Sequence, residues 1–349
     1  MVSYLELFSP FASTYSQKQL ILVINMKLLI LSNNPARASF RQRIGIYIDR
    51  LQNNGFDSAV EKIPAGSLAR FQLFKKTEEF DVVFLHKKGL NPLDAFILKK
   101  FSKKIIYDFD DAIMYKPAAP QQNSSSHYTK FRRSVKIADL VIAGNNYLAE
   151  QARKFNDNVQ ILLTGLDTSE YNINTDKKDD KIRLVWIGST STLKYLKQLK
   201  PVLEEIGQEN KNVILRIICD TFFNTKNIPV EKKNWSKKTQ AYDLVTADIG
   251  LAPLPNNRFT RGKCGFKILQ YAAAGLPVIT SPVGVNKKLV KQGQTGCFAE
   301  NNNQWKQNIT ELIKSCKTRK IMGQNNRIFA ENFDINVIGE KLVELIKNS

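Results

Sequence analysis

Short apolar runs alternate with amphipathic segments along most of the chain. Continuous apolar runs bounded by polar residues occupy 27–32, 81–86, 104–109, 139–144 and 159–164. Such runs are typical of strands that are buried on both faces of a parallel sheet. Between them, 41–55 and 147–155 carry apolar residues at helical spacing, and Gly55 is a helix stop signal. The alternation predicts βαβ units.

The same pattern returns after a polar interruption. Residues 167–181, DTSEYNINTDKKDDK, interrupt the alternation, and we interpret them as an interdomain linker. Apolar runs then follow at 182–188, 213–219, 248–254, 277–281 and 295–300, and helices are expected at 304–315 and 335–347. The pattern therefore predicts an α/β fold with two doubly wound parallel-sheet domains, 26–166 and 182–333.

The first 25 residues do not fit this pattern. The run LILVINMKLLIL is apolar over only about a dozen positions, short of the roughly 20 that a membrane span needs. Met26 opens a strand and turn typical of an α/β domain. Our hypothesis is that residues 1–25 are a leader or a mis-assigned start.

The positive net charge of the chain favours anionic binding partners. The formal net charge of +20 favours nucleic acid, phosphate esters or an acidic membrane, although a Lys-, Asn- and Ile-rich composition explains much of it equally well. The chain shows no nucleic-acid-binding signature, and its lysines scatter over both domains. Aromatic-basic segments at 74–76, 98–104 and 131–133 predict peripheral contact with anionic lipid, at the cytoplasmic face of an inner membrane.

The spacing of the cysteines indicates neither a disulfide framework nor a metal site. Cys219, Cys264, Cys297 and Cys316 lie far apart without a CxxC pair, which argues against a zinc site or a disulfide scaffold and fits a reducing cytoplasm.

Ligands of open α/β sheets bind beyond the carboxyl ends of the strands. In the first domain this rule selects Arg41 and Arg43, which either contact an anionic acceptor or donor phosphate or form an exposed basic face. Asp110 and Asp111 either orient an acceptor hydroxyl or cap the next helix. For His86 a structural role is the safer interpretation, although its place at a strand end directs it toward the cleft, and His127 is also interpreted as structural.

In the second domain the rule selects the stretch RGKCGFKILQYAAAGLPV, 261–278. On an ideal helix its polar residues Lys263, Lys267 and Gln270 share one face, and Ile268, Leu269 and Ala272 face the core. Free N–H groups at the helix start can bind a phosphate that both lysines neutralise. The alternative is that both lysines are solvated surface charges. Gly275 is the expected C-cap.

Four segments together carry a resemblance. Residues 262–301 resemble the donor-binding segment of retaining glycosyltransferases of family 4, and 138–155 with 161–171 are similar to the end of their first domain. YDFDDAIMY, 107–115, resembles a stretch of some bacterial members. The resemblance implies a GT-B fold: two Rossmann-like domains across a cleft, with a last helix in 334–349 that crosses back to the first domain.

The resemblance also implies an activity. Such enzymes transfer a sugar from a nucleotide-sugar donor to a glycan or lipid-linked acceptor with retention of configuration, here in surface polysaccharide or glycolipid synthesis. They usually need no metal and no cofactor. Because the chain shows GT-B alternation, DFDD is not interpreted as the metal-binding DxD motif of the other large glycosyltransferase fold.

The site residues follow from the matched positions. Catalytic roles fall to Lys263 and Lys267, which stabilise the leaving diphosphate, and to Asp110 and Asp111. Donor contacts are expected from Gly188, Ser189, Lys194, Gly265, Phe266 and Gln270, and acceptor contacts from Arg41, Arg43 and His86.

Some positions depart from the family pattern. Gly262 and Gln270 stand where two glutamates are usual, Ser189 stands for an arginine, and Lys194 is one position out of register. The contact to the transferred sugar is therefore in doubt. Two alternatives stay open: a catalytically degenerate GT-B protein that binds nucleotide sugar, and a basic nucleic-acid-binding protein.

Overall fold

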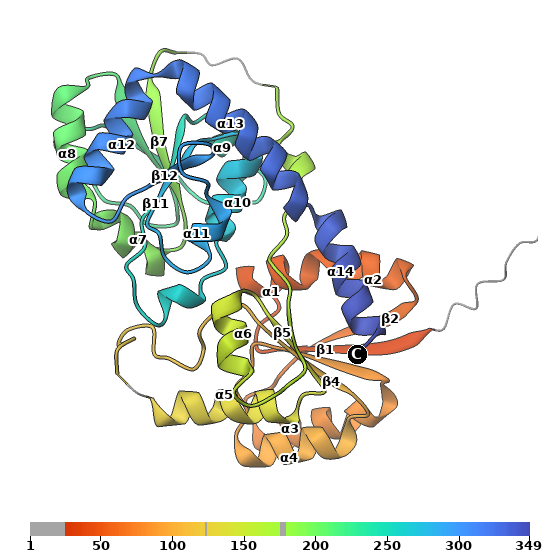
Figure 1. The fold of residues 1–349 in the computed structure, drawn as a ribbon. Coiled ribbons are helices and arrows are strands. Elements are labelled where there is room, and N and C mark those ends of the chain that lie inside the picture. The colour runs from red at the N-terminus through yellow and green to blue at the C-terminus, as the bar shows by residue number, and fades with distance from the viewer. Residues whose placement is uncertain (1–24, 123, 175–178) are drawn as a thin grey trace, which may run out of the picture.

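Two parallel sheets organise the chain. The computed structural model describes residues 25–122, 124–174 and 179–349. Within them the first sheet has the strand order β2-β1-β3-β4-β5-β6 and the second β12-β11-β10-β7-β8-β9 (Figure 1). Helices cover both faces of each sheet. This is the GT-B arrangement of two α/β domains that the sequence predicts.

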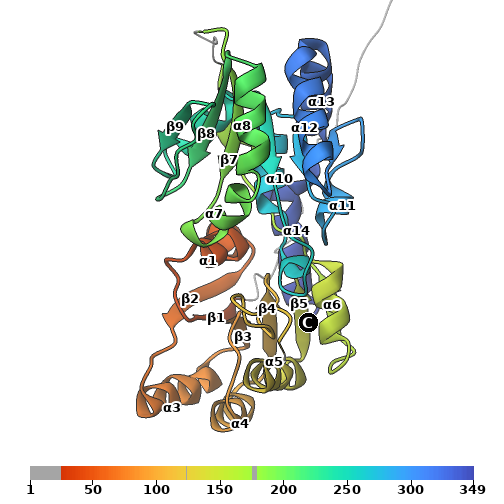
Figure 2. The same ribbon diagram turned by 90° about the vertical axis from the view of Figure 1, so that its left-hand side faces the viewer.

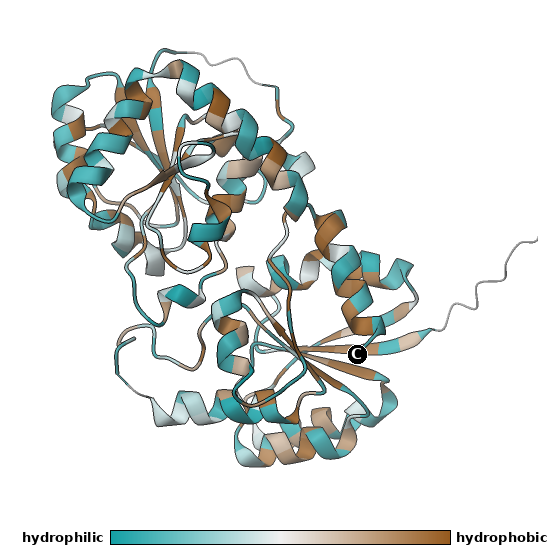
Figure 3. Cartoon of the chain, viewed as in Figure 1, coloured by the Kyte–Doolittle hydropathy of each residue, from teal (hydrophilic) through white to brown (hydrophobic). Residues whose placement is uncertain are grey.

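The first sheet is built from the apolar runs of the first half of the chain. Its strands β1 to β6 are Met26–Ser32, Phe56–Lys62, Val82–His86, Ile105–Phe109, Leu140–Ala143 and Val159–Ile161. Successive residues of β1 enter different cores: Leu29 and Leu31 pack on one face, Leu28 and Ile30 on the other. Because both faces are buried, the strand is apolar throughout, as Figure 3 shows by its brown interior strands.

The helices around this sheet are α1 Ala38–Arg43, α2 Ile48–Asn53, α3 Ser67–Lys75, α4 Pro92–Phe101, α5 Ser125–Ile137 and α6 Asn146–Ala152. Side chains of α3 to α6 pack in one core cluster, whereas α1 and α2 pack on the opposite face.

The second sheet has strands β7 to β12 at Ile182–Ile187, Val213–Ile218, Val230–Lys233, Ile249–Ala252, Val278–Thr280 and Gly296–Phe298. Its helices are α7 Thr190–Lys197, α8 Lys200–Glu209, α9 Gln240–Val245, α10 Phe266–Ala273, α11 Asn286–Leu289, α12 Asn302–Lys314 and α13 Cys316–Ala330. Side chains of α7, α8, α12 and the start of α13 cover one face, and those of α9, α10 and α11 the other.

The last helix, α14 at Ile335–Lys347, belongs to the other half of the molecule. Its apolar residues Ile338, Leu342 and Ile346 are buried in the core of the first sheet. Figure 1 shows this dark blue helix beside the red strands of the first domain. Of the expected linker, Thr168–Tyr171 forms a 3₁₀ turn whose Tyr171 packs in the second-domain core, and 175–178 lie outside the described residues.

One expected helix differs in the structure, and two strands were not expected. The helix expected at 41–55 is divided into α1, a 3₁₀ turn at Gly45–Tyr47, and α2. Strands β2 and β9 were not predicted, because each lies at a sheet edge and its residues are largely half-buried or exposed rather than continuously apolar.

Residues 1–24 lie outside the described residues, so the hypothesis about the start is not addressed. In the part of the chain that is described, no helix combines the length and the hydropathy of a membrane span.

Candidate functional site

The strand register brings the carboxyl ends of the first sheet level with one another. Ser32 pairs with His86 across β1 and β3, and His86 pairs with Asp108 across β3 and β4. The loops beyond these strands face the second domain. Figure 2 shows that the 3₁₀ turn η4, Thr260–Gly262, descends from the second domain beside α6 of the first.

A buried triad anchors this edge. The Arg43 guanidinium donates through Nε and Nη2 to Asp108 Oδ1 at 2.9 and 2.7 Å, and His86 Nδ1 lies 3.0 Å from Asp108 Oδ2. Arg43 and His86 are each 3% exposed. The expectation that Arg43 and His86 contact the acceptor is therefore wrong for this structure, because both side chains are enclosed and their nitrogens have partners within the protein: Asp108 for both, the Leu162 carbonyl for Arg43, and Ser39 for His86. They hold the strand ends in place.

The triad connects to the two carboxylates of DFDD. Ser39 Oγ lies 3.3 Å from His86 Nε2 and donates to both Asp110 oxygens at 2.9 Å. Lys87 Nζ pairs with Asp110 at 2.9 Å and also with Asp111. Neither aspartate caps a helix, since the next helix begins at 125 with its own serine cap. The capping alternative is thus wrong.

The charges in this cluster support one another. Burial opposes ionisation of Asp110, but Lys87 and His86 outweigh it and hold the pKa of this carboxyl well below its usual range. Burial likewise opposes the charge of Lys87, and the two carboxylates outweigh it and raise the lysine pKa. Asp110 therefore stays ionised at neutral pH and presents hydrogen-bond acceptors to the cleft.

The loop before α10 lies directly on this cluster. Lys263 Nζ pairs with Asp111 Oδ1 at 2.7 Å, and the Lys263 carbonyl accepts from Asn145 Nδ2 at 3.0 Å. The Cys264 thiol donates to the Asp110 carbonyl at 3.1 Å. One of the two lysines expected at the donor phosphate thus bridges the two domains.

The helix α10 begins later than expected. Gly265 is its N-cap at φ +68°, and Phe266 is its first residue, so Lys263 precedes the helix. A Cβ at Gly265 would lie 2.3 Å from Leu289, so only glycine fits. The expected polar face is also wrong at Gln270, which is 4% exposed and donates to Tyr171 Oη at 3.4 Å and Gln240 Oε1 at 3.3 Å. The apolar face and the left-handed Gly275 after the helix are as predicted.

Lys267 is the most unusual cation of the site. Its Nζ lies 4.1 Å from the centre of the Trp186 ring, and no carboxylate of the described residues forms an ion pair with it. Burial, and to a lesser extent the charge of Lys263, lowers its pKa from 10.5 to about 7. At Gly188, which follows β7, a Cβ would lie 2.8 Å from this Nζ. Gly188 and Lys267 are therefore in contact at the end of the second sheet.

The helix after Gly188 has free N–H groups at its start. Ser189 is the N-cap of α7, but its hydroxyl makes no capping bond and instead lies 3.0 Å from Ser191 Oγ. Lys194 is exposed, with its ammonium 5.4 Å from the Tyr195 ring. The next residue, Tyr195, is 8% exposed and experiences the charges of Lys263 and Asp111.

Arg41 extends to the second domain. Its guanidinium lies 5.4 Å from the centre of the Trp235 ring, and Trp235 Nε1 donates to Gln240 Oε1 at 3.1 Å. Gln240 in turn accepts from Gln270. Arg41, predicted to contact the acceptor, and Gln270, predicted to contact the donor, are thus linked through Trp235 and Gln240. Sequence reasoning identified neither Trp235 nor Gln240.

Sequence reasoning also missed Lys87, Ser39 and Tyr195. His86 was selected by its place at a strand end, but the lysine that follows it was not. No residue pattern identifies Ser39 or Tyr195. The described residues hold no cluster of three or more His, Cys, Asp or Glu side chains able to bind a metal.

Residues 157–315, just under half of the chain, match the family model described as Glycosyl transferases group 1. This segment is similar to glycosyl transferases of group 1, and it includes Gly188, Lys263 and Lys267. A curated relative, spore coat protein SA of Bacillus subtilis (strain 168), is 33% identical over 81 residues, and the match spans 22% of this chain and 22% of that protein.

Solved structures share the whole fold at low identity. HepE of Anabaena in complex with UDP and glucose is 14% identical at a TM-score of 0.68, over 93% of this chain and 100% of that one. Sucrose-phosphate synthase of Thermosynechococcus elongatus is 13% identical at 0.72, over 93% and 98%. WaaG, a glycosyltransferase involved in lipopolysaccharide biosynthesis, is 14% identical at 0.68, over 92% and 100%.

Proposed function

We propose that this chain is a glycosyltransferase of family 4 that transfers a sugar from a nucleotide-sugar donor to a glycan or lipid-linked acceptor with retention of anomeric configuration. The similarity to group 1 supports the donor class, since related folds are crystallised with UDP or UDP-glucose. We further propose that no metal takes part, and that the acceptor belongs to surface polysaccharide or glycolipid synthesis.

Lys267 carries the proposal. An ammonium with no carboxylate partner, placed against Gly188 and near the start of α10, fits the diphosphate of a donor. As the glycosidic bond breaks, negative charge grows on that diphosphate, and a fixed cation stabilises it more in the transition state than in the ground state. The free N–H groups of α7 beside Ser189 offer further hydrogen bonds to the diphosphate.

The first domain would position the acceptor. Asp110 is ionised and keeps 17% of its side chain exposed beside Lys87. Because its pKa is low, the carboxylate is suited to accept a hydrogen bond from an acceptor hydroxyl rather than to store a proton. Ser39, His86 and Asp108 fix its orientation.

The proposal is tested by donor binding and turnover. A thermal-shift panel of UDP-, GDP-, dTDP- and CMP-sugars without divalent metal should identify one donor class, and NMR of the product should show the donor's anomeric configuration. Lys267→Ala should lower kcat/KM roughly 30-fold to 1000-fold, which corresponds to a loss of about 2–4 kcal/mol of transition-state stabilisation. Lys200→Ala, at an exposed site on α8, is the control. Duplex DNA bound more tightly than every nucleotide sugar would overturn the proposal.

We also propose peripheral contact with an anionic membrane through α3 and α4. Leu68 on α3 is 73% exposed, and Leu93 and Phe96 on α4 are 60% and 67% exposed. Lys99 and Lys100 follow on α4. Sedimentation with liposomes should rise with the fraction of anionic lipid and fall with salt, whereas equal binding to neutral vesicles would exclude an electrostatic contribution.

A further inference from the structure

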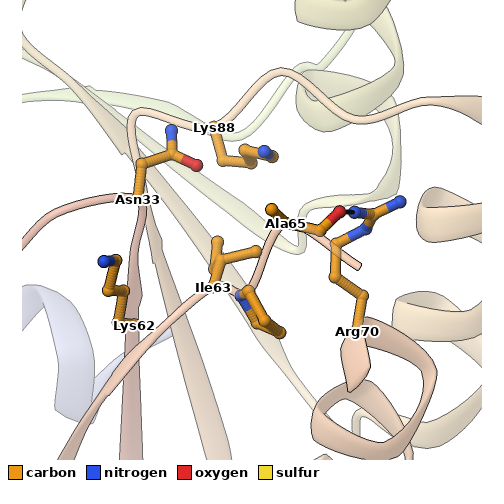
Figure 4. A pocket seen from close by; sticks show the side chains of 7 residues that line it. Asn33, Lys62, Ile63, Ala65, Arg70 and Lys88 are labelled. Atoms are coloured by element: carbon orange, nitrogen blue, oxygen red, sulfur yellow. Dashed lines mark hydrogen bonds between the residues drawn. The ribbon is translucent and has the colours of Figure 1, made fainter. Parts of the chain in front are cut away.

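A second cationic site lies beside the carboxylate cluster, at the β2 side of the first sheet. A cavity of about 580 Å³ opens there, where the chain leaves β1, β2 and β3 (Figure 4). It is lined by Asn33, Lys62, Ile63, Pro64, Ala65, Arg70 and Lys88. The residues assigned above to the donor or the carboxylate cluster are not part of its lining.

The lining carries unbalanced positive charge. Arg70 Nε pairs with Asp94 Oδ1 at 3.0 Å, and its remaining nitrogens donate to the Ala65 carbonyl and to Ser67 Oγ. Neither Lys62 nor Lys88 has an ion-pair partner among the described residues. Burial lowers the pKa of Lys88, and Arg70 adds to this effect while Asp94 opposes it. Among the described residues, two lysines at one cavity are therefore without an ion-pair partner.

The start of α3 adds hydrogen-bond donors. Gly66 is the N-cap of this nine-residue helix and provides no side-chain cap, and Pro64 and Ala65 of the cavity wall lie directly before it. The first N–H groups of a helix lack intrahelical partners and carry partial positive charge. The N–H groups at the start of α3 add to the positive potential of the two lysines. The exposed Asn33 side-chain amide can donate a further hydrogen bond.

A strained turn connects the cavity to the carboxylate cluster. Among the described residues, Lys87 is the non-glycine residue with a positive φ, 52°. Its side chain binds Asp110 and Asp111, whereas the side chain of the next residue, Lys88, lies at the cavity (Figure 4). Strain of this kind persists where the surrounding structure imposes it, often at functional sites. Consecutive lysines thus serve two adjoining sites.

We propose that this cavity binds a phosphate group carried by the acceptor. Two unpaired lysines and a helix start match the double charge of a phosphate ester better than the single charge of a carboxylate. The turn at Lys87 then sets the acceptor hydroxyl toward Asp110 while the phosphate stays beside Lys88. The acceptor role rests on the proposed function, but phosphate binding itself does not.

The first test measures binding without turnover. The protein is saturated with the nucleoside diphosphate identified by the panel, which occupies the donor site, and is then titrated with inorganic phosphate in a calorimeter. Lys62→Ala and Lys88→Ala should each weaken phosphate binding about tenfold. Lys136→Ala, an exposed charge on α5, should leave it unchanged. Wild-type affinity in both cavity variants would overturn the proposal, and circular dichroism checks that they are folded.

A second arm separates a soluble phosphate ester from a lipid headgroup. The probes are glucose 1-phosphate and phosphatidylcholine vesicles with or without phosphatidic acid. Weaker binding of the variants to acidic vesicles alone assigns the site to a lipid phosphate, and weaker binding to the sugar phosphate alone assigns it to a soluble ester. If neither binding is weakened, the proposal fails.

The two proposals fail in different ways. Tenfold weaker phosphate binding in a protein that transfers no sugar would reject the enzymatic function and keep the anion site. Full sugar transfer by wild-type protein, with unchanged KM for acceptor in Lys62→Ala and Lys88→Ala, would reject the anion site and keep the function.

Discussion

At the residue scale, the role proposed for Lys267 at the donor diphosphate predicts that donor binding is coupled to protonation. Its pKa of about 7 means that half of the free protein carries a neutral amine at neutral pH. A bound diphosphate favours the charged form and raises this pKa. Donor binding should therefore take up close to one proton at pH 8 and about half a proton at pH 7, and affinity should fall as pH rises above 7.

Calorimetry in two buffers of different ionisation enthalpy measures this uptake. A nucleotide sugar is the suitable probe, because its diphosphate does not titrate in this range. Lys267→Arg keeps the charge and should abolish the uptake, since arginine stays protonated. Uptake near zero in the wild-type protein at pH 8 would show that Lys267 does not meet the diphosphate.

The same residue predicts a stability difference. A lowered lysine pKa means that the unfolded chain binds more protons than the folded state between pH 7 and about 10.5, so the stability contribution of Lys267 rises with pH across that window. Lys267→Met should raise the Tm at pH 7, and the gain should shrink toward pH 10. A Tm gain that is independent of pH would point to packing rather than to the buried charge.

At the element scale, the segment before α10 leaves no room for a side chain at Gly262, where the resemblance to family 4 leads us to expect a glutamate. A Cβ at Gly262 would lie 2.7 Å from the Ala112 Cβ and 2.8 Å from its backbone nitrogen. A side chain there has no room while η4 rests on the first domain. Glycine at this position is therefore the residue that fits the interdomain contact.

Gly262→Glu should consequently separate the loop from the first domain rather than restore a sugar contact. The Cys264 thiol, whose pKa burial and the Asp110 charge raise, should then react faster with a thiol reagent, while exposed Cys316 reacts as before. Mass spectrometry resolves the two labels. Gln294→Glu adds the same charge at an exposed site. An unchanged Cys264 rate with higher transfer activity would contradict this account.

The elements that sequence predicts well are those with one dominant physical cause. Continuous apolar runs identify interior strands such as β1 and β3, because two buried faces require them. The edge strand β2 has half-exposed positions and lacks that signal. Helical spacing at 41–55 did not reveal the break at Gly45–Tyr47.

For the candidate site, the strand-end rule selected loops that lie together in the structure, but it did not reveal the contacts between their side chains. It selected Asp110, Asp111 and Lys267, yet Arg43 and His86 are buried against Asp108, and these two partners come from α1 and β3. The bridge from Lys263 to Asp111 joins positions 152 residues apart in the chain. Such pairings arise from domain docking, for which a single sequence carries no local pattern.

At the scale of the whole molecule, α14 connects the end of the chain to the first domain. Its residues lie in the same core as Leu28 and Ile30 of β1, although Thr168–Tyr171 and the strands before α14 belong to the second half of the structure. Where the two interdomain connections pass each other, Leu166 N donates to the Phe333 carbonyl and Ile335 N donates to the Leu166 carbonyl, each at 3.0 Å. The stability of the first domain therefore depends on residues that follow the second.

Leu342→Ala tests this dependence directly. The side chain is 1% exposed in the core of the first sheet, so its truncation should cost about 2–5 kcal/mol of unfolding free energy. The loss should fall on the first domain. A nucleotide sugar, which we propose binds mainly to the second domain, should therefore not restore the unfolding temperature that the substitution lowers. Calorimetric scans with and without donor measure both effects. Ile328→Ala on α13, where the side chain is 72% exposed, should cost far less. Equal losses in the two variants, or a loss confined to the donor-stabilised transition, would mean that α14 does not support the first domain.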